Sequence, residues 1–313
     1  MSRLRDLALG LSLTLAALPA AGEIAFVTCQ NGDAVSVVDL DTGTERARWE
    51  VPGKPAGVAV GKDAVFTVSP DSKTVRRFSL HGEVTAATTL DGGPIGAVYH
   101  PGHDRLFVSD WYNARLWALD GMTLEVQAEL PAGAAPAGLA LSPDGRLLAT
   151  AERDADRISL YDTETLALLR SMPVGTRPFG LGFAPDGRLF VGNVGSNDVT
   201  VIDPASGEVL ATVPVGERPY GVAFAAGRAF VTNQYDNTLS VIALADLAPV
   251  ATLETGEYPE GIAATADGRI AVANWFDNTL SLIDAASLET MAVLDTADGP
   301  RAFGAFLFDG DLP

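Results

Sequence analysis

The chain has very few of the residues that form covalent cross-links or redox centres. Its 313 residues include one cysteine, Cys29, so an intrachain disulfide is excluded and packing must stabilise the fold. We interpret Cys29 as a strand-end residue, with a reactive or interchain thiol as the alternative. The sequence has no Cys-x-x-Cys-His haem attachment site, phosphate-binding glycine loop or nucleophile elbow. No cofactor is therefore predicted.

Histidine is almost as scarce, with His81, His100 and His103 as its only three positions. His100 and His103 have the spacing of a metal-binding pair. Their segment, however, aligns with turns elsewhere in the chain, such as residues 142–145 and 184–187. A metal site would need a third ligand, and none is recognisable nearby. We interpret the segment as a turn and predict no metal.

Positive charge is also scarce. The chain has 21 Lys and Arg residues against 40 Asp and Glu residues, a formal net charge of −19. Such a surface repels phosphate backbones and anionic membranes, unless a local basic patch overrides it. This charge disfavours nucleic acid as a partner.

Only one apolar run is long enough to suggest targeting. Arg3 and Arg5 precede an apolar run over residues 7–18, and small residues follow at positions 20–22. The run is shorter than the roughly 20 residues that span a bilayer. We predict a signal peptide over residues 1–22, with an uncleaved anchor as the alternative. The mature protein, residues 23–313, is then periplasmic or secreted and free of the membrane.

The most informative feature that is present is an internal repeat. A Pro-x-Gly element recurs, and its prolines lie 39–42 residues apart. A last, irregular copy begins at Pro300, and the first glycine after this proline is Gly304. The six regular copies begin at Pro55, Pro94, Pro136, Pro178, Pro219 and Pro259. Self-similarity at this period is typical of propellers and solenoids.

Each repeat contains four short strand patterns. In the unit at residues 217–256, we expect strands over residues 222–224, 229–232, 239–242 and 250–253. Asp-Gly and Asp-Asn turns lie between such segments, and no segment shows a convincing helical period. Four strands about every 40 residues describe a propeller blade.

The two ends of the chain complement each other. Residues 24–28, 35–39 and 45–51 supply three strands without a first one, and residues 303–308 supply a first strand alone. Joined, they complete a blade and leave no open sheet edge. The sequence predicts a single all-β domain over residues 23–313. It is a seven-bladed β-propeller of four-stranded blades, closed by one C-terminal strand beside three N-terminal strands.

Several strand segments resemble the YVTN β-propeller repeat, which is similar in organisation to the WD40 repeat. The segments read FVGN, FVTN and AVAN at residues 190–193, 230–233 and 271–274, followed by DVTVID, NTLSVI and NTLSLID. The resemblance covers residues 23–308. It implies the propeller fold, and relatives include propellers associated with periplasmic quinoprotein dehydrogenases. Nucleic-acid binding occurs among relatives, but the net charge makes it the weakest interpretation here.

Aligning the repeats places cations around one mouth of the central channel. Lys54, Arg177 and Arg218 directly precede a repeat proline, and Arg301 directly follows one. Arginine there can hold a carboxylate or phosphate, or contact an acidic partner. The alternative is that these cations pair with local carboxylates or cap carbonyls. The other positions after the proline are Ala56, Ile95, Ala137, Phe179, Tyr220 and Glu260, which should line the same mouth.

Aromatic residues gather in the loops that follow the second strands, on the same side of the predicted ring. They are Trp111, Tyr112, Tyr235, Trp275 and Phe276. Exposed aromatics commonly anchor protein interfaces. Packing between neighbouring loops is the alternative, although the other blades have no aromatics at these positions.

The last position of each second strand is polar in most repeats. We interpret Asn193, Asn233 and Asn274 as structural, because their amides can satisfy backbone groups at the strand-to-loop turn. Asp110, Glu152 and Asn193 are the residues from which an enzymatic cluster would have to be built.

These observations favour an exported, non-catalytic binding or scaffold protein. The resemblance implies a role as an accessory to a periplasmic quinoprotein or cytochrome redox system. Its partner would be a protein or an anionic small molecule held at the channel mouth by the cations and aromatics. The alternative is a propeller enzyme or cofactor handler, because seven-bladed propellers include lactone hydrolases, C–O lyases and haem-binding domains. Such a protein would have its site at the same mouth.

Overall fold

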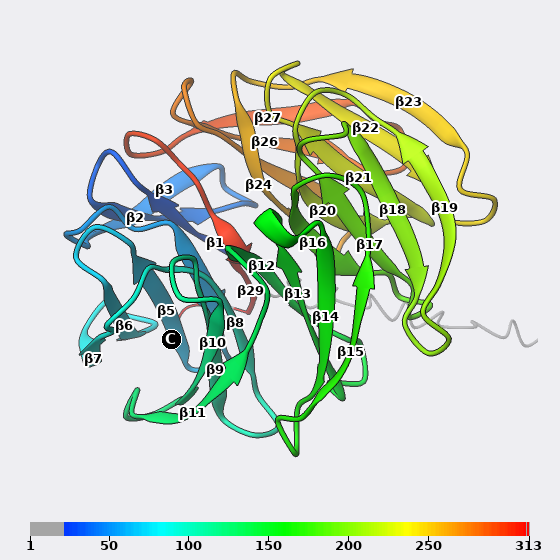
Figure 1. The fold of residues 1–313 in the computed structure, drawn as a ribbon. Helices are drawn as coiled ribbons and strands as arrows, with labels where there is room; N and C mark the ends of the chain where they lie inside the picture. Colours follow the sequence, from blue (N-terminus) through cyan, green and yellow to red (C-terminus); the bar gives the residue numbers. More distant parts are fainter. Residues whose placement is uncertain (1–21, 311, 313) are drawn as a thin grey trace, which may run out of the picture.

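Seven β-sheets are arranged around a central axis in the computed structural model, which describes residues 22–310 and 312 (Figure 1). The predicted seven-bladed propeller is confirmed. The predicted signal segment lies outside the described residues apart from Gly22. Within the described part of the chain, no helix has the length and apolar character needed to cross a membrane.

The first three blades are numbered in the order in which their first β-hairpins occur along the chain. Blade 1 contains β29 (Leu307–Asp309), β1 (Glu23–Cys29), β2 (Ala34–Asp39) and β3 (Thr44–Glu50). Blade 2 contains β4 (Gly57–Val60), β5 (Ala64–Ser69), β6 (Thr74–Ser79) and β7 (Val84–Thr89), with β28 (Phe303–Ala305) added to its inner edge. Blade 3 contains β8 (Pro94–His100), β9 (Arg105–Asp110), β10 (Arg115–Asp120) and β11 (Val126–Pro131).

The remaining four blades are each built from consecutive antiparallel strands. Blade 4 contains β12 (Pro136–Leu141), β13 (Leu147–Glu152), β14 (Arg157–Asp162) and β15 (Leu168–Pro173), with the 3₁₀ turn η1 (Arg153–Ala155). Blade 5 contains β16 (Pro178–Phe183), β17 (Leu189–Asn193), β18 (Asp198–Asp203) and β19 (Glu208–Pro214). Blade 6 contains β20 (Pro219–Ala225), β21 (Arg228–Asn233), β22 (Thr238–Ala243) and β23 (Pro249–Glu254). Blade 7 contains β24 (Pro259–Ala264), β25 (Arg269–Asn274), β26 (Thr279–Asp284) and β27 (Thr290–Asp295).

Burial along each blade follows its position in the ring. The second and third strands are buried almost throughout, because neighbouring blades cover both of their faces. They accordingly read as continuous β-branched and aliphatic runs rather than as alternating patterns. The fourth strands are mostly exposed and carry the polar side chains of the rim. The core is therefore a series of apolar layers between the blades.

The Pro-x-Gly element lies where adjacent blades approach most closely. A Cβ atom on Gly96 would collide with the carbonyl oxygen of Ala137, and one on Gly180 with that of Tyr220. A bulge after the proline removes the glycine N–H from the strand ladder. The N–H of Gly96 donates instead to Ser109 Oγ at 2.9 Å, and this hydroxyl donates onward to the Ala137 carbonyl at 2.7 Å. The motif is thus a joint between blades.

The ring closes in the predicted manner, with one C-terminal strand beside three N-terminal strands. β29 pairs antiparallel with β1, and Phe26 N–H donates to the Phe306 carbonyl at 2.8 Å. The predicted single strand over residues 303–308 is divided, however. β28 pairs in parallel with β4 of blade 2, and only β29 belongs to blade 1. The cause is a longer bulge after Pro300, which displaces residues 302–305 toward the channel.

Phe306 tests how much the closing segment contributes to stability. Its side chain is fully buried in the core layer of blade 1. Phe306→Ala should lower the free energy of unfolding by about 3–5 kcal/mol, because it removes a large buried ring and leaves a cavity. Leu169→Ala, at a position that is 55% exposed on β15, should change it by less than about 0.5 kcal/mol. Urea unfolding followed by circular dichroism measures both, and equal effects would contradict a stabilising closure.

Candidate functional site

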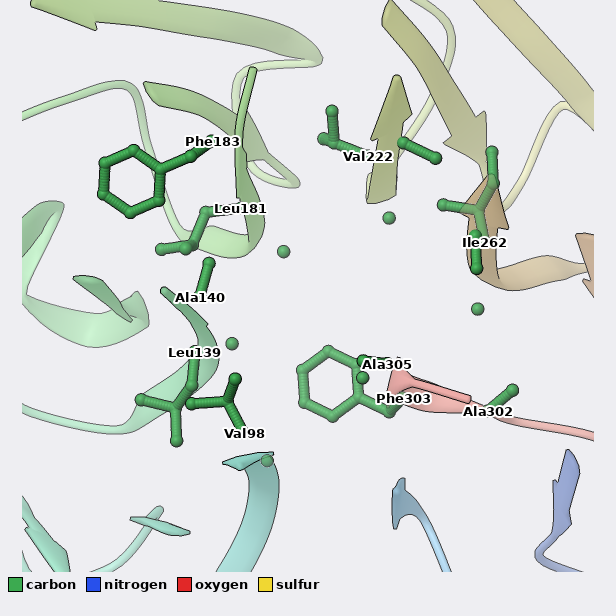
Figure 2. A pocket seen from close by; sticks show the side chains of 18 of the residues that line it. Val98, Leu139, Ala140, Leu181, Phe183, Val222, Ile262, Ala302, Phe303 and Ala305 are labelled. Carbon is green, nitrogen blue, oxygen red and sulfur yellow. The ribbon is translucent and has the colours of Figure 1, made fainter. Parts of the chain in front are cut away.

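The centre of the ring contains an open cavity of about 640 Å³ (Figure 2). It is lined by the innermost strands of blades 3–7 and by the closing segment. Most lining side chains are aliphatic or aromatic, including Val98, Leu139, Leu181, Val222 and Ile262.

We call the side of the ring that carries the repeat prolines the proline face. The opposite side, which carries the turns between the first and second strands, is the turn face.

Three aromatic rings pack together at the proline end of this cavity. Phe179 lies 4.6 Å from Tyr220 and 5.2 Å from Phe303, and Tyr220 lies 5.5 Å from Phe303, between ring centroids. All three side chains are buried. Phe303 comes from the closing segment, whose long bulge brings it into the channel. The channel mouth is therefore filled by aromatic side chains.

A polar cluster lies beside these rings. Arg301 donates to Tyr220 Oη from Nε at 3.1 Å and from Nη2 at 2.8 Å, and to Gln30 Oε1 at 2.9 Å. Its Nε also lies 3.2 Å from Glu260 Oε2. Gln234 Nε2 donates to Glu260 Oε1 at 2.6 Å. Glu260 Oε2 accepts no hydrogen bond from any described residue.

The electrostatics of this cluster follow from its burial. Burial raises the pKa of Glu260 to about 7, although Arg301 and the hydrogen bond from Gln234 oppose the shift. Burial also raises the pKa of Tyr220 well above its ordinary value. Perturbed carboxyl groups of this kind are characteristic of functional sites, though buried ion pairs in structural roles show them too. Glu260 is the one carboxylate among the residues that line the cavity.

The four predicted cations occupy different environments. Arg301 is partly buried in the polar cluster, whereas Lys54 Nζ lies 3.7 Å from Asp33 Oδ2 and donates to the Asn31 carbonyl at 3.2 Å. Arg218 Nε donates to Gln234 Oε1 at 3.2 Å. Arg177 is exposed, and only its backbone has hydrogen-bond partners among the described residues. The four cations therefore lie in four separate environments, and only Arg177 has a side chain without a hydrogen-bond partner among the described residues.

The predicted aromatics divide into two groups. Trp111 is partly buried beside Phe179, with Arg153 over its ring, and Tyr112 next to it is 75% exposed. The larger group lies on blades 6 and 7. Tyr258, which the aromatic analysis of the sequence did not include, contacts Tyr235, Trp275 and Phe276 at centroid distances of 5.7, 6.3 and 4.9 Å.

The group on blades 6 and 7 forms an exposed surface that we call the aromatic patch, comprising Arg218, Tyr235, Tyr258, Trp275 and Phe276. Tyr235 is 53% exposed and Phe276 is 59% exposed. The Arg218 guanidinium carbon lies 4.6 Å from the Tyr235 ring centroid. Arg301 lies 5.1 Å from the Trp275 ring and so joins the patch to the buried cluster. Tyr258 is the central residue of the patch because it contacts the other three aromatic rings. It occupies the position before a repeat proline, where the backbone has a positive φ of 61°.

The polar residues at the ends of the second strands are structural. Asp110 accepts hydrogen bonds from Gly93 N–H at 2.8 Å, Asn113 Nδ2 at 3.0 Å and Arg115 Nε at 2.9 Å. Glu152 is bound in the same way by Arg157 and Ser159. Each therefore has its partners in its own blade or in the loop leading to it, and they form no shared enzymatic cluster with Asn193.

The asparagines at the same strand position bind hydroxyl groups rather than backbone groups. Asn233 Nδ2 donates to Thr238 Oγ1 and Ser240 Oγ, both at 2.9 Å. Asn274 makes the equivalent pair of bonds to Thr279 and Ser281, whereas Asn193 Nδ2 donates to one hydroxyl, of Thr200, and to the Asp198 carboxylate. Cys29 occupies this position in blade 1, where burial raises the pKa of its thiol and makes it unreactive.

The histidine pair forms the expected turn on the turn face. His100 Nδ1 accepts the His103 N–H at 3.1 Å, and His100 Nε2 lies 2.9 Å from the Gly145 carbonyl oxygen. Both ring nitrogens of His100 are thus engaged by the protein. Among the described residues, no group of three or more His, Cys, Asp or Glu side chains is placed to hold a metal ion.

Sequence reasoning did not select Glu260, Tyr220 or Phe179 as site residues. The signal was present, because all three directly follow a repeat proline, as Arg301 does. The alignment placed them at the mouth, but only the cations were chosen there. Phe303 could not be found in this way, since it reaches the mouth through the irregular bulge of the closing segment.

The structural role of Asp110, the last residue of β9, can be tested by measuring stability at different pH values. Burial opposes its ionisation, but hydrogen bonds from Gly93, Asn113 and Arg115 outweigh this and hold the pKa below its ordinary value. Its carboxylate therefore stabilises the fold above about pH 4 and loses this effect as pH falls through the depressed pKa. Asp110→Asn should cost about 1–3 kcal/mol at pH 7 and progressively less below pH 4. Urea unfolding across this range measures it, with exposed Asp71→Asn as the charge-matched control. A pH-independent cost would contradict the assignment.

Comparison with solved structures shows the fold at low sequence identity. Hydrazine synthase of Kuenenia stuttgartiensis matches with a TM-score of 0.74 and 17% identity, covering 90% of this chain and 100% of that chain. A protein of unknown function from Desulfotomaculum acetoxidans matches with a TM-score of 0.76 and 16% identity, covering 93% and 100%. No curated protein matches the sequence.

The sequence profile of one family, described as "Lactonase, 7-bladed beta-propeller", matches residues 58–224. The match spans a little more than half of the chain, from β4 in blade 2 to β20 in blade 6. It agrees with the seven sheets around one axis. The chain therefore belongs to the seven-bladed β-propeller lactonase family.

Proposed function

We propose that this protein is an exported, non-catalytic binding protein whose proline face docks a protein partner. The observation that supports this most is the aromatic patch on blades 6 and 7. Tyr235 and Phe276 are each more than half exposed, and the Arg218 guanidinium lies over the Tyr235 ring. Tyrosine, tryptophan and arginine are the residues that dominate the energetics of protein interfaces.

The surroundings of the cations favour a protein partner over an anionic small molecule. A small anion needs several donors that converge on one point. Arg301 is already committed to Tyr220, Gln30 and Glu260, and Lys54 to Asp33 and Asn31. The channel mouth between them is filled by aromatic rings. Arg177 and Arg218 remain available as rim contacts of a larger interface.

The proposed setting is the periplasm or the extracellular space. The support is the signal-like sequence of residues 1–22 and the resemblance of the strands to the YVTN repeat. Relatives of that repeat family associated with quinoprotein dehydrogenases make a redox system the natural context for the partner. The net charge of −19 favours a partner whose docking surface is basic around an apolar centre.

The aromatic patch can be tested by partner capture. Immobilised residues 23–313 are exposed to periplasmic extract of the native organism, beside a variant carrying Arg218→Ala, Tyr235→Ser and Phe276→Ser. We expect one dominant protein on the parent chain, bound at least about tenfold more weakly by the variant, because interface aromatics and arginine carry most of the binding energy. Purified partner and surface plasmon resonance give the affinities.

The matched control is Val209→Ser with Leu210→Ser, which removes comparable exposed apolar surface from β19 at the rim. It should bind the partner as the parent does. Equal capture by the parent and the patch variant, or no specific capture by the parent, would refute the docking role of this face.

Lactone hydrolysis is the second candidate function. The family match supports it, and so does Glu260, a buried carboxyl group with a pKa of about 7 beside a guanidinium and a phenol at the cavity end. A group with that pKa is suited to general-base catalysis near neutral pH. It would take a proton from water as the water oxygen adds to the lactone carbonyl. The protonated carboxyl group would then return that proton to the departing alkoxide as the tetrahedral intermediate collapses and the ring C–O bond breaks, which gives the hydroxy acid. The burial of the carboxylate requires some opening of the mouth before substrate can reach it.

Glu260→Gln distinguishes this second candidate. If Glu260 is the base, hydrolysis of a simple γ- or δ-lactone should rise with pH through about 7, where the carboxyl group ionises. The variant should then lose activity about 100-fold or more. Glu129→Gln, on the exposed strand β11, is the matched control and should retain full activity. A parent chain no faster than buffer, or a fully active Glu260→Gln, would exclude this mechanism.

A further inference from the structure

We propose that the central cavity is a binding site for an uncharged, largely hydrocarbon small molecule, which enters from the turn face. This site is independent of the docking surface on the proline face. It rests on the size of the cavity, the chemistry of its walls and the closure of one of its ends.

The size of the cavity is that of a ligand site. Protein interiors are close-packed, and few of their voids exceed the volume of a water molecule. A cavity of about 640 Å³ is far larger and falls within the usual range for small-molecule pockets, about 300–1,000 Å³. A ring of seven inner strands encloses a central space, and this space stays open where the side chains that point into it are too small to fill it. Glycine and alanine supply many of the lining positions here, including Gly138, Gly180 and Ala263.

The walls select an apolar, uncharged occupant. Figure 2 shows Val98, Leu139, Leu181, Phe183, Val222 and Ile262 around the cavity. Among the described residues that line the cavity, the only ionisable ones are Glu260 and Tyr220, and both are engaged with Arg301. Because this lining holds no cationic side chain, an anionic ligand would lose its hydration without gaining a partner, which is strongly unfavourable, and the one carboxylate is already paired with Arg301. Hydrocarbon transfers favourably into such a site.

The route of entry follows from the two ends of the channel. At the proline end, the rings of Phe179, Tyr220 and Phe303 are in mutual contact. At the other end, the lining includes Pro143 and Pro185, which belong to turns of the turn face. The cavity is open, so the turn face provides the access.

Ala305 gives a direct way to fill the cavity. It lies on β28 and lines the cavity (Figure 2), and the residue is exposed. A larger side chain at this position can extend into the free space without displacing core residues. Ala205 is a suitable control because it is exposed in the turn between β18 and β19, on the outer part of blade 5.

The experiment titrates residues 23–313 with the uncharged fluorescent probe N-phenyl-1-naphthylamine. We expect saturable binding by the parent chain, weakened at least tenfold by Ala305→Trp and unchanged by Ala205→Trp. Phe276→Ser should also leave probe affinity unchanged, which separates this site from the aromatic patch. Val222→Thr, which keeps the side-chain shape and adds a hydroxyl to the cavity wall, should weaken binding several-fold even if Ala305→Trp fails to fold.

Competition at pH 8 tests the charge preference. Decan-1-ol should displace the probe, whereas decanoate, of the same chain length, should require at least tenfold higher concentration. The proposal is overturned if the parent chain shows no saturable binding. It is also overturned if Ala305→Trp and Val222→Thr both bind the probe as tightly as the parent, or if decanoate competes as well as decanol.

Discussion

The contact on which the rest of this structure depends is the approach of one blade's backbone to the next at the Pro-x-Gly element. The glycine leaves no room for a Cβ atom, because a carbonyl oxygen of the following blade occupies that space. In blades 3 and 6 a buried hydroxyl adds a bridge to this contact, as Thr232 does between Gly221 N–H and the Glu260 carbonyl. Repeated around the ring, this joint sets the spacing of the inner strands and thereby the radius of the channel. Proline starts the strand without a donor to leave unsatisfied.

This joint also determines which residues meet at the channel mouth. The residue between proline and glycine is held at the proline end of the channel in every regular repeat, so its side chain is free to vary while its backbone is not. Phe179, Tyr220 and Glu260 occupy this position, and Arg301 is its counterpart in the closing segment. The result is one face that carries aromatic and ionic chemistry, and a channel behind it that is almost wholly apolar. The two proposed binding sites use these two regions separately.

Charge pairing explains why a strongly acidic chain can keep a buried cation at its centre. Desolvating Arg301 alone would be prohibitive, but Glu260, Tyr220 and Gln30 satisfy it. The same logic governs Asp110 and Glu152, whose arginine partners come from the adjacent strand. Buried charge in this fold therefore marks places where neighbouring strands or loops are held together, and it becomes a functional signal only where it borders the cavity. Glu260 meets that condition, and Asp110 does not.

The number of blades, the four strands of each, the closure of the ring by both chain ends and the set of positions at the mouth could all be predicted from the sequence. This was possible because strand period, turn residues and the Pro-x-Gly element are local signals that recur about every 40 residues. Which of those side chains are buried, paired or exposed depends instead on how the ring assembles. Arg301 bonds to Gln30, 271 positions away, and Phe303 enters the channel because the bulge before β29 is longer than its counterparts. Tyr258 becomes the central residue of the aromatic patch through contacts with loops of two blades. Such pairings arise where the ring brings distant segments together, and no local pattern encodes them.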